Sequence, residues 1–365
     1  MNEAVLHYCL PIQIVCIAFL LFHYVRRKLP ATPTMLPQQN HEPISIIICA
    51  HNEAKNLEEN LPRILAQQHL EATVIVVNDR STDHTADVLA TLASTHPQLH
   101  IIEVSEAEKN IPGKKLLLLK ALQAATTEKI IVTDADCFPA STLWAAHMST
   151  YLNGNTRLVL GFSPFYQQRS LLNKFIRFEA TQTAWLYFSE TAQGNAYMGV
   201  GRNMAFYKSD FLQWFQNTTH AIAGGDDDLF VNATATQNNV ALCLQPDSFV
   251  FTHAATSWQI FFRQKARHVQ AAYYYKKQDQ LLLFLFALTQ FLTIAIPICS
   301  ILHLPLLMLS IPLWLTLQTA LSFKAYKKFA QTDLVKWIPL LQLIFIFYLL
   351  IVFLLSLLKG KKTWN

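Results

Sequence analysis

The stretch "IIVTDADCFPAS", residues 130–141, joins a short apolar run to two carboxylates one residue apart. Asp134 and Asp136 stand where the apolar run ends, and Pro139 marks a turn soon after them. The β-branched residues at 130–133 favour a strand, and the lack of strict alternation indicates that both of its faces are buried. The stretch therefore predicts a buried strand that carries two acids at its carboxyl end.

Three similar runs precede this strand, and helical patterns lie between all four. The predicted strands are "ISIIICA" (44–50), "TVIVVND" (73–79), "HIIEV" (100–104) and "KIIVTDAD" (129–136). The predicted helices are 53–68, 81–96 and 114–126. Regular alternation of strands and helices is typical of an α/β domain with a parallel sheet and helices on both faces.

Acidic residues follow three of the four runs. Asp79 closes the second run, Asp134 and Asp136 close the fourth, and Glu53 comes shortly after the first. Capping of the next helix would account for the polar residues at 81–83, but not for acids that stand before a turn. Ligands of parallel sheets bind at the carboxyl ends of the strands, so we expect these acids to meet in one site.

The chain is too apolar for a wholly soluble protein, with 52% hydrophobic and 15% charged residues in 365. Residues 4–25, 281–323 and 337–358 contain no Asp, Glu, Lys or Arg, and about 20 apolar residues span a bilayer as a helix. We expect one span at 4–25, two in 281–323 with a turn near His303–Pro305, and one at 337–358. The first run could be a cleaved signal peptide, but no small-residue cleavage site precedes the "RRKLP" that follows it, which favours an anchor.

The net charge of +5 indicates a membrane partner and no nucleic acid, because the Lys and Arg residues flank the apolar runs. Placing 29–275 on the cytoplasmic side puts the basic residues after the first span inside, as the positive-inside rule expects. Four crossings then leave both termini outside. A re-entrant late segment would leave the C-terminus inside. The six cysteines include no CxxC pair, which indicates packing residues in a reducing compartment more than zinc ligands or disulfides.

The glycines exclude two nucleotide-binding folds. No GxGxxG follows the first strand and no GxxxxGK[ST] occurs, so neither an NAD-type fold nor a P-loop is expected. "GNAYMGVGRN" (194–203) and "AGGDDDLF" (223–230) combine glycine with polar residues. Glycine permits tight turns and close approach of a ligand, so both segments are predicted to line the site.

Together these motifs resemble the inverting glycosyltransferases of family 2, and more narrowly the membrane-anchored branch of cellulose, hyaluronan and ceramide-glucose synthases. The motifs stand in the family's order: "AHNE" (50–53), "VVNDRSTD" (76–83), "DAD" (134–136), the glycine-rich segment, "GGDDD" (224–228) and "RQKARH" (263–268). The resemblance implies a GT-A domain with a mostly parallel sheet, flanked by transmembrane helices. The expected domains are an anchor at 1–28, a linker at 29–43, the GT-A domain at 44–257, an interfacial helix at 258–280 and about three spans in 281–365.

The resemblance also implies how a nucleotide-sugar donor, a UDP-sugar by this likeness, would be held. Asp79 resembles the acid that bonds the uracil ring, and Glu53 would help to hold the nucleoside. Asp134 and Asp136 resemble the DXD motif: Asp136 would ligate Mg²⁺ or Mn²⁺, with Asp134 on the ribose or the outer shell of the metal. Lys114 resembles a lysine near the diphosphate, although plain surface charge would explain it equally.

The base that activates the acceptor is expected in "GGDDDLF". The family alignment puts Asp226 in place of a Glu and makes Asp227 the base, while a shift of one residue would make it Asp226 or Asp228. The three acids could also simply cap the following helix. Near 264–268 the family's QxxRW motif becomes QxxRH: Gln264 and Arg267 would bind the diphosphate, and the missing Trp puts processivity in doubt.

The resemblance thus implies a metal-dependent enzyme of the bacterial inner membrane, with a cytoplasmic active site and a lipid or lipid-linked acceptor. Two other interpretations stay open: a processive polysaccharide synthase, and a non-catalytic membrane scaffold that only binds nucleotide. The segment 170–190 is predicted to be an amphipathic helix with Trp185, Tyr187 and Phe188 near its end. These side chains could line an acceptor entrance or rest on lipid, and contact with lipid is favoured.

Overall fold

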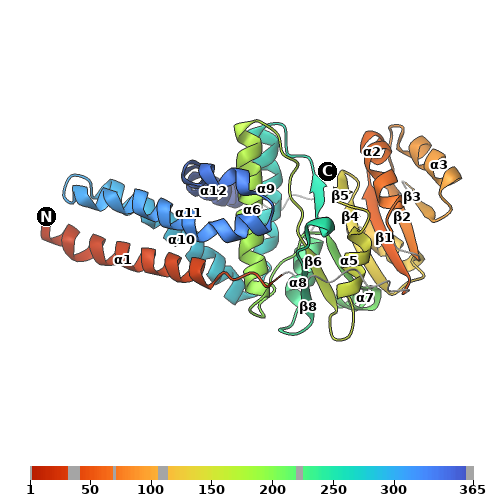
Figure 1. The fold of residues 1–365 in the computed structure, drawn as a ribbon, viewed down its shortest axis with the longest axis horizontal. Helices are drawn as coiled ribbons and strands as arrows, with labels where there is room; N and C mark the ends of the chain where they lie inside the picture. The colour runs from red at the N-terminus through yellow and green to blue at the C-terminus, as the bar shows by residue number, and fades with distance from the viewer. Residues whose placement is uncertain (1, 32–41, 69–70, 106–113, 219–224, 359–365) are drawn as a thin grey trace. The chain divides into compact units, whose positions relative to one another are not determined.

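The computed structural model describes residues 2–31, 42–68, 71–105, 114–218 and 225–358 (Figure 1). The chain divides into two compact units, which are described separately. The sheet unit comprises Pro30–Gln167 and Glu190–Thr256, and the helical unit comprises Met1–Leu29, Gln168–Ser189 and Ser257–Lys359.

The sheet unit is built on a seven-stranded sheet of order β3-β2-β1-β4-β7-β6-β8. Its strands are β1 (Ile44–Ala50), β2 (Ala72–Asp79), β3 (Leu99–Val104), β4 (Lys129–Asp134), β6 (Leu158–Gly161), β7 (Met204–Tyr207) and β8 (Val240–Cys243). The first four are parallel to one another, and β7 is antiparallel to both β4 and β6. A separate antiparallel ribbon joins β5 (Cys137–Pro139) to β9 (Val250–Thr252).

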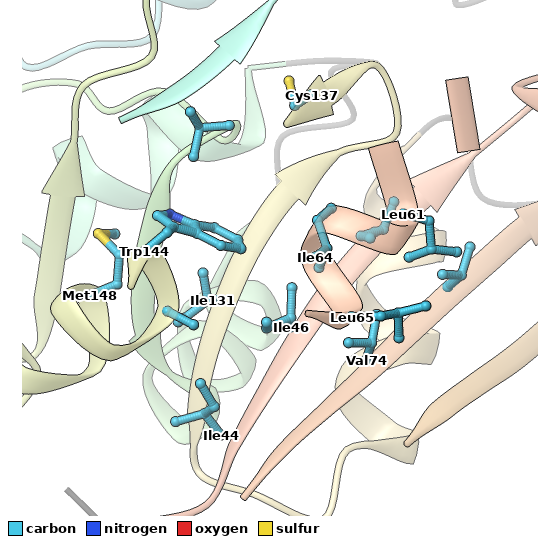
Figure 2. Close-up of a cluster of buried hydrophobic side chains, with 14 of the residues drawn as sticks. Ile44, Ile46, Leu61, Ile64, Leu65, Val74, Ile131, Cys137, Trp144 and Met148 are labelled. Carbon is cyan, nitrogen blue, oxygen red and sulfur yellow. The ribbon is translucent and has the colours of Figure 1, made fainter. Parts of the chain in front are cut away.

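Helices pack on both faces of this sheet because its central strands are apolar on both faces. The helices of the unit are α2 (Ala54–Leu65), α3 (Thr85–Thr95), α4 (Lys114–Ala124), α5 (Trp144–Tyr151), α7 (Lys208–Asn217) and α8 (Asp226–Thr234), with the 3-10 turn η2 (Pro246–Ser248). Ile44, Ile46 and Ile48 point into one cluster with α2, α3 and α5 (Figure 2). Ile47, also buried, points to the other face, where α4 contacts β1 and β2.

The predicted α/β fold and its four parallel strands are confirmed. Strand β4 pairs in register with β1, which brings Asp134 level with Cys49 at the end of β1. Burying each Ile or Val of these strands stabilises the fold by about 1.5–3 kcal/mol. This apolar centre sets the positions of the polar strand ends above it.

The helical unit contains the apolar segments. Its elements are α1 (Asn2–Arg26), α6 (Leu171–Thr191, which continues into the other unit), α9 (Trp258–Ala272), α10 (Lys277–Cys299), η3 (Pro305–Leu309), α11 (Ser310–Lys328), η4 (Thr332–Trp337) and α12 (Ile338–Leu358). Within the residues described, four segments are long and apolar enough to cross a membrane: Tyr8–Arg26, Lys277–Cys299, Pro305–Lys328 and Thr332–Leu354. The chain is therefore suited to a membrane, with one such helix before the sheet unit and three after it.

A ring of polar side chains joins these four helices. Gln318 donates to the Tyr24 hydroxyl at 2.8 Å and to Gln342 at 2.6 Å, and Gln342 donates to Gln290 at 3.0 Å. Gln290 closes the ring by donating to Tyr24 at 3.4 Å. Helices in lipid gain little from apolar contact alone, so hydrogen bonds between buried polar groups help to specify their packing.

The prediction that the aromatic end of the 170–190 helix rests on lipid is wrong. Trp185, Tyr187 and Phe188 are all at most 2% exposed. The indole N–H of Trp185 donates to the Arg27 carbonyl at 3.1 Å, and Phe188 stacks on Phe329. Helix α6 is thus packed inside the helical unit rather than lying along its surface.

Candidate active site

The loops after β1 and β2 are held together by their own polar side chains. The backbone N–H of Asn52 donates to the Ser81 hydroxyl at 2.9 Å, and that of Thr82 donates to the Asn52 side chain at 2.8 Å. Asp83 accepts from the backbone N–H groups of Ala54 and Thr85. These bonds give the "AHNE" and "NDRSTD" motifs a fixed shape at the carboxyl edge of the sheet.

Asp79 lies at the end of β2 and is 8% exposed. Its carboxylate accepts two hydrogen bonds from the guanidinium of Arg80, at 2.6 and 3.1 Å. The Asp79 carbonyl contacts the ring Nδ1 of His51 at 2.5 Å. Since a carboxylate has about four acceptor positions, the side chain of Asp79 retains capacity for a donor such as a nucleobase N–H.

Four further acids interact electrostatically: Glu53, Asp83, Asp134 and Asp136. Burial raises the pKa of the Glu53 carboxyl, and the negative charges of Asp136, Asp134 and Asp83 raise it further, against a hydrogen bond from Asn56 that lowers it. Like charges raise a carboxyl pKa because each disfavours ionisation of the other. Acids gathered in this way are suited to a cation.

The immediate surroundings of Asp136 decide which cation fits. Oxygen atoms of Asp134 and Asp136 and the Cys137 sulfur all lie within 4.8 Å of one another. Burial raises the pKa of the Cys137 thiol well above its usual range, followed by the charges of Asp136 and Asp134. The thiol therefore stays protonated and donates to Asp136 at 3.2 Å. Thr252 donates to the other oxygen of Asp136 at 3.1 Å.

The atoms that could ligate a metal here are thus carboxylate oxygens and not the protonated sulfur. Hard oxygen ligands suit Mg²⁺ and Mn²⁺, which keep open positions for phosphate oxygens. Asp136 with Asp134 fits such an ion, and the raised pKa of Glu53 marks a place where positive charge is favourable.

The acids at the start of α8 occupy three different environments. Asp226 is buried and lies 3.0 Å from the Lys115 ammonium, which is buried as well. Asp228 is 9% exposed. Asp227 is half-buried, and its Oδ2 accepts the backbone N–H of Gly201 at 2.6 Å. Of the three, Asp227 is the acid that an incoming acceptor reaches most easily.

Glycine at position 201 leaves room for this contact. A Cβ atom there would lie 3.0 Å from Asp227 Oδ2, so a larger residue would require the carboxylate to shift by a few tenths of an ångström. Gly225, which precedes the helix, has φ +77°, a left-handed conformation that favours glycine. The two glycine-rich segments therefore meet at Asp227.

The structure describes the backbone but not the side chain of the lysine that was expected near the diphosphate. Lys114 is the first residue of α4, but its side chain lies outside the described residues. The neighbouring Lys115 is the one that contacts Asp226. Gln264 and Arg267 lie one turn apart on α9 and are exposed. They belong to the helical unit, so their contact with a donor stays a prediction.

The sequence reasoning missed Arg202. This half-buried residue follows Gly201, and its guanidinium stacks on the Phe165 ring at 4.8 Å. Its positive charge acts on the Cys137 thiol beside Asp136. The sequence does place a cationic residue directly after "GVG" in a loop predicted to line the site. That position could have indicated a role for Arg202, because a diphosphate beside acids needs a positive charge.

Comparison with known proteins identifies the family of the matched domain. Residues 45–225 match the family described as Glycosyl transferase family 2. The structure of the mannosyltransferase PcManGT from Pyrobaculum calidifontis, in complex with GDP-Man and Mn²⁺, has the same fold, with a TM-score of 0.58 and 19% identity. It covers 94% of this chain and 99% of that one.

Two curated relatives match over shorter regions. The chain is 24% identical over 120 residues to poly-beta-1,6-N-acetyl-D-glucosamine synthase of Staphylococcus epidermidis, covering 32% of this chain and 28% of the synthase. It is 36% identical over 97 residues to 4,4'-diaponeurosporenoate glycosyltransferase of Staphylococcus aureus, covering 27% of this chain and 24% of that enzyme. The matched part thus spans about a quarter of each relative. Residues 45–225 thus form a domain of glycosyl transferase family 2, and the chain has the GT-A fold.

Proposed function

We propose that the protein transfers one sugar from a nucleotide-sugar, a UDP-sugar by preference, to a lipid or lipid-linked acceptor, with inversion and with Asp227 as the base. The observation that carries this proposal is the Gly201–Arg202 pair. One residue of the pair bonds to the accessible acid Asp227, and the charge of the other acts on the Cys137 thiol, which donates to Asp136. Adjacent residues would thereby connect the base with the diphosphate site.

The donor would lie along the carboxyl edge of the sheet. Asp79 would accept the base N–H, and Glu53 would support the nucleoside at the end of β1. Asp136, with Asp134 beside it, would hold Mg²⁺ or Mn²⁺, which when bound neutralises charge on the diphosphate leaving group. Arg202 would bind the same diphosphate through the fork of its guanidinium. Gln264 and Arg267 of α9 are proposed as further groups that bind the donor.

The transfer step follows from the environment of Asp227. The acceptor hydroxyl gives its proton to the Asp227 carboxylate as its oxygen forms a bond to the anomeric carbon. The bond from that carbon to the diphosphate oxygen breaks, and the nucleoside diphosphate leaves. The bond from Gly201 fixes the carboxylate before the acceptor arrives, so little reorientation is needed during the reaction. Asp226, bound to Lys115, is poorly placed to accept a proton.

A membrane-borne acceptor is supported by the four apolar helices of the same chain. One relative that matches part of the chain is named for glycosyl transfer to 4,4'-diaponeurosporenoate. A membrane-held enzyme meets such acceptors at the bilayer surface, and the basic residues that flank the helices favour the cytoplasmic side.

The test uses the purified full-length protein in lipid nanodiscs with a panel of nucleotide-sugars that includes UDP-glucose, UDP-N-acetylglucosamine and GDP-mannose. Release of nucleoside diphosphate is measured with and without extracted membrane lipids, and products are sized by mass spectrometry. We expect one donor to be consumed faster with lipid and one sugar to be added per product. Long products would favour a processive synthase, and binding of nucleotide without any turnover would favour a scaffold.

The variant Asp227→Asn decides the assignment of the base. Loss of a general base lowers the rate by about 10²–10⁴-fold, with the affinity for the nucleotide little changed. If Asp226→Asn or Asp228→Asn gives the large loss instead, and Asp227→Asn stays active, the base is misassigned.

A further inference from the structure

A buried ion pair lies within the helical unit, and the transfer step does not use it. The Lys265 ammonium is 2.6 Å from a carboxylate oxygen of Glu179, and the two side chains are 17% and 6% exposed. Lys265 belongs to α9, inside the sequence "QKARH" (264–268), and Glu179 belongs to α6 (Figure 1). Tyr348 of α12 donates its hydroxyl to the other oxygen of Glu179 at 3.2 Å. The pair therefore connects α9 with two further helices of the same unit.

Aromatic rings surround this pair. Phe261 of α9 packs on Phe175 of α6 and on Tyr348, with ring centroids 5.9 and 5.5 Å apart. The Lys265 ammonium lies 5.7 Å from the centre of the Phe261 ring. The hydrophobic effect is non-directional, so these rings hold α9 against α6 and α12 but define its rotation about its own axis less sharply.

The ion pair distinguishes one rotation of α9 from its neighbours. Removing two charges from water cancels much of their attraction, so a buried pair adds little net stability, and the best-attested role of buried polar groups is to specify how helices pack. Turning α9 by one residue, about 100°, would move the Lys265 ammonium away from Glu179. The uncharged Gln264 or Ala266 would then face the buried carboxylate, which would be left without its cation.

The rotation that Lys265 selects determines which side chains α9 exposes. Gln264 and Arg267 lie about 100° and about 160° from Lys265, in the same direction around the helix axis. Both are exposed, and so are Ile260 and Arg263, which share their face at spacings of three and four residues. The exposed face thus carries both side chains of α9 that the proposed function assigns to the donor.

The alternative explanation is a simple anchor, and a second ion pair on α6 offers a comparison. Arg177, two residues before Glu179, donates to the two carboxylate oxygens of Asp333 at 2.9 and 2.7 Å. Arg177 is buried and Asp333 is 39% exposed. That pair ties α6 to η4, between α11 and α12, and contains no residue of α9. Breaking it should loosen the helical unit without turning α9.

We propose that Lys265 and Glu179 are positioning residues, which set the rotation of α9 and so keep Gln264 and Arg267 on its exposed face for the nucleotide-sugar. This inference rests on the proposed role of Gln264 and Arg267 in donor binding. Neither residue of the pair is expected to touch the donor. The lysine inside the "QKARH" segment thereby acquires a role that the motif itself does not supply.

The first experiment follows the rotation of α9 without turnover. Arg263→Cys probes the exposed face, and Val269→Cys probes the half-buried side, one turn after Lys265. The rate of reaction with a water-soluble maleimide is measured for the full chain in nanodiscs, and mass spectrometry locates the label because the chain has six cysteines of its own. We expect Arg263→Cys to react faster than Val269→Cys, and the difference to narrow when Lys265→Met is added. An unchanged difference would overturn the proposal.

The second experiment separates positioning from anchoring through the donor KM. Lys265→Met combined with Glu179→Gln removes both charges, and glutamine still accepts the hydrogen bond from Tyr348. Removing a whole buried pair is often neutral for stability, so the Tm should stay close to that of the wild type. The donor KM should nevertheless rise about 10–100-fold, as expected when hydrogen bonds to a charged group are lost, with kcat much less affected. Lys265→Arg keeps a cation that can pair with Glu179 and should keep the wild-type donor KM.

Asp333→Asn is the matched control, which should lower the Tm and leave the donor KM unchanged. A normal donor KM in the doubly substituted variant would overturn the proposal, and so would a raised donor KM in Asp333→Asn, because any loosening of the helical unit would then have the same effect. Arg267→Gln separates this inference from the proposed function. If Arg267→Gln raises the donor KM and the doubly substituted variant does not, only the positioning role fails. If Arg267→Gln leaves the donor KM normal, the donor role of α9 is refuted and the positioning role with it.

Discussion

Replacing Asp226 by asparagine tests whether this acid stabilises the fold or takes part in catalysis. The side chains of Asp226 and Lys115 are 10% and 9% exposed and lie 3.0 Å apart. Burial lowers the pKa of the Lys115 ammonium, because a buried environment disfavours its charged form. The variant leaves that charge without the carboxylate.

The expected loss of stability is large. Breaking a buried ion pair by removing one partner costs about 3–5 kcal/mol, and we expect the lower end, about 3 kcal/mol, because the asparagine carbonyl still presents a partial negative charge to the ammonium. For a unit of about 200 residues each kcal/mol lowers the unfolding temperature by roughly 2–4 °C. The Tm of Asp226→Asn should therefore fall by about 6–12 °C.

The assay is thermal unfolding of the full chain in detergent, followed by tryptophan fluorescence, with activity measured well below the transition. Asp210→Asn is the matched control. Asp210 pairs with Arg157 at 2.7 Å, but the two side chains are 26% and 40% exposed. Exposed pairs contribute about 0–1 kcal/mol, so this control should lower the Tm by less than about 4 °C.

The outcome that refutes this reasoning is a stable but inactive Asp226→Asn. A Tm within about 2 °C of the wild type, together with a rate loss above about 100-fold, would make Asp226 the base. In the expected case Asp226→Asn loses stability and less than about tenfold in rate, whereas Asp227→Asn keeps its Tm within a few degrees and loses the rate.

Three other predictions concern separate parts of the molecule. Asp136→Asn should abolish the stimulation of transfer by added Mn²⁺ or Mg²⁺, and full activity of this variant, or of the wild type in EDTA, would contradict the metal site. Arg202→Gln should raise the donor KM about 10–100-fold, since hydrogen bonds to charged groups contribute about 1.5–3 kcal/mol; a normal donor KM would exclude Arg202 from the diphosphate. Gln342→Leu removes two hydrogen bonds of the helical unit, to Gln318 and Gln290, and should lower its stability in detergent by about 1 kcal/mol, a loss that thermal unfolding would reveal.

The sheet and its acidic edge could be predicted from the sequence because local signals and tertiary packing agree there. The strands β1, β2 and β4 are rich in β-branched residues, and both of their faces are buried. A strand that is apolar throughout has one stable position, the centre of a sheet covered on both faces. The acids at its end must then stand at the edge, as Asp79 and Asp134 do.

The partners of individual side chains could not be predicted in this way. Lys114 and Lys115 are equivalent in the sequence, and only the direction of the first turn of α4 selects Lys115 for Asp226. Trp185 and Phe188 look like residues of a lipid-facing surface, but their partners, Arg27 and Phe329, come from distant parts of the chain. Long-range contacts of this kind leave no periodic pattern at either end.

The same reasoning explains why three adjacent aspartates do not play one role. A helix start turns by about 100° per residue, so consecutive side chains at the N-terminus of α8 point in three directions. One direction meets the Lys115 ammonium, and another meets the Gly201 N–H. Only an acid whose environment leaves it accessible and charged can accept a proton from a substrate, so we propose that the pairing with the buried lysine excludes Asp226 from that role. We therefore interpret Asp226 as part of a structural ion pair and Asp227 as the candidate base. Measuring stability and rate in both variants distinguishes these two roles.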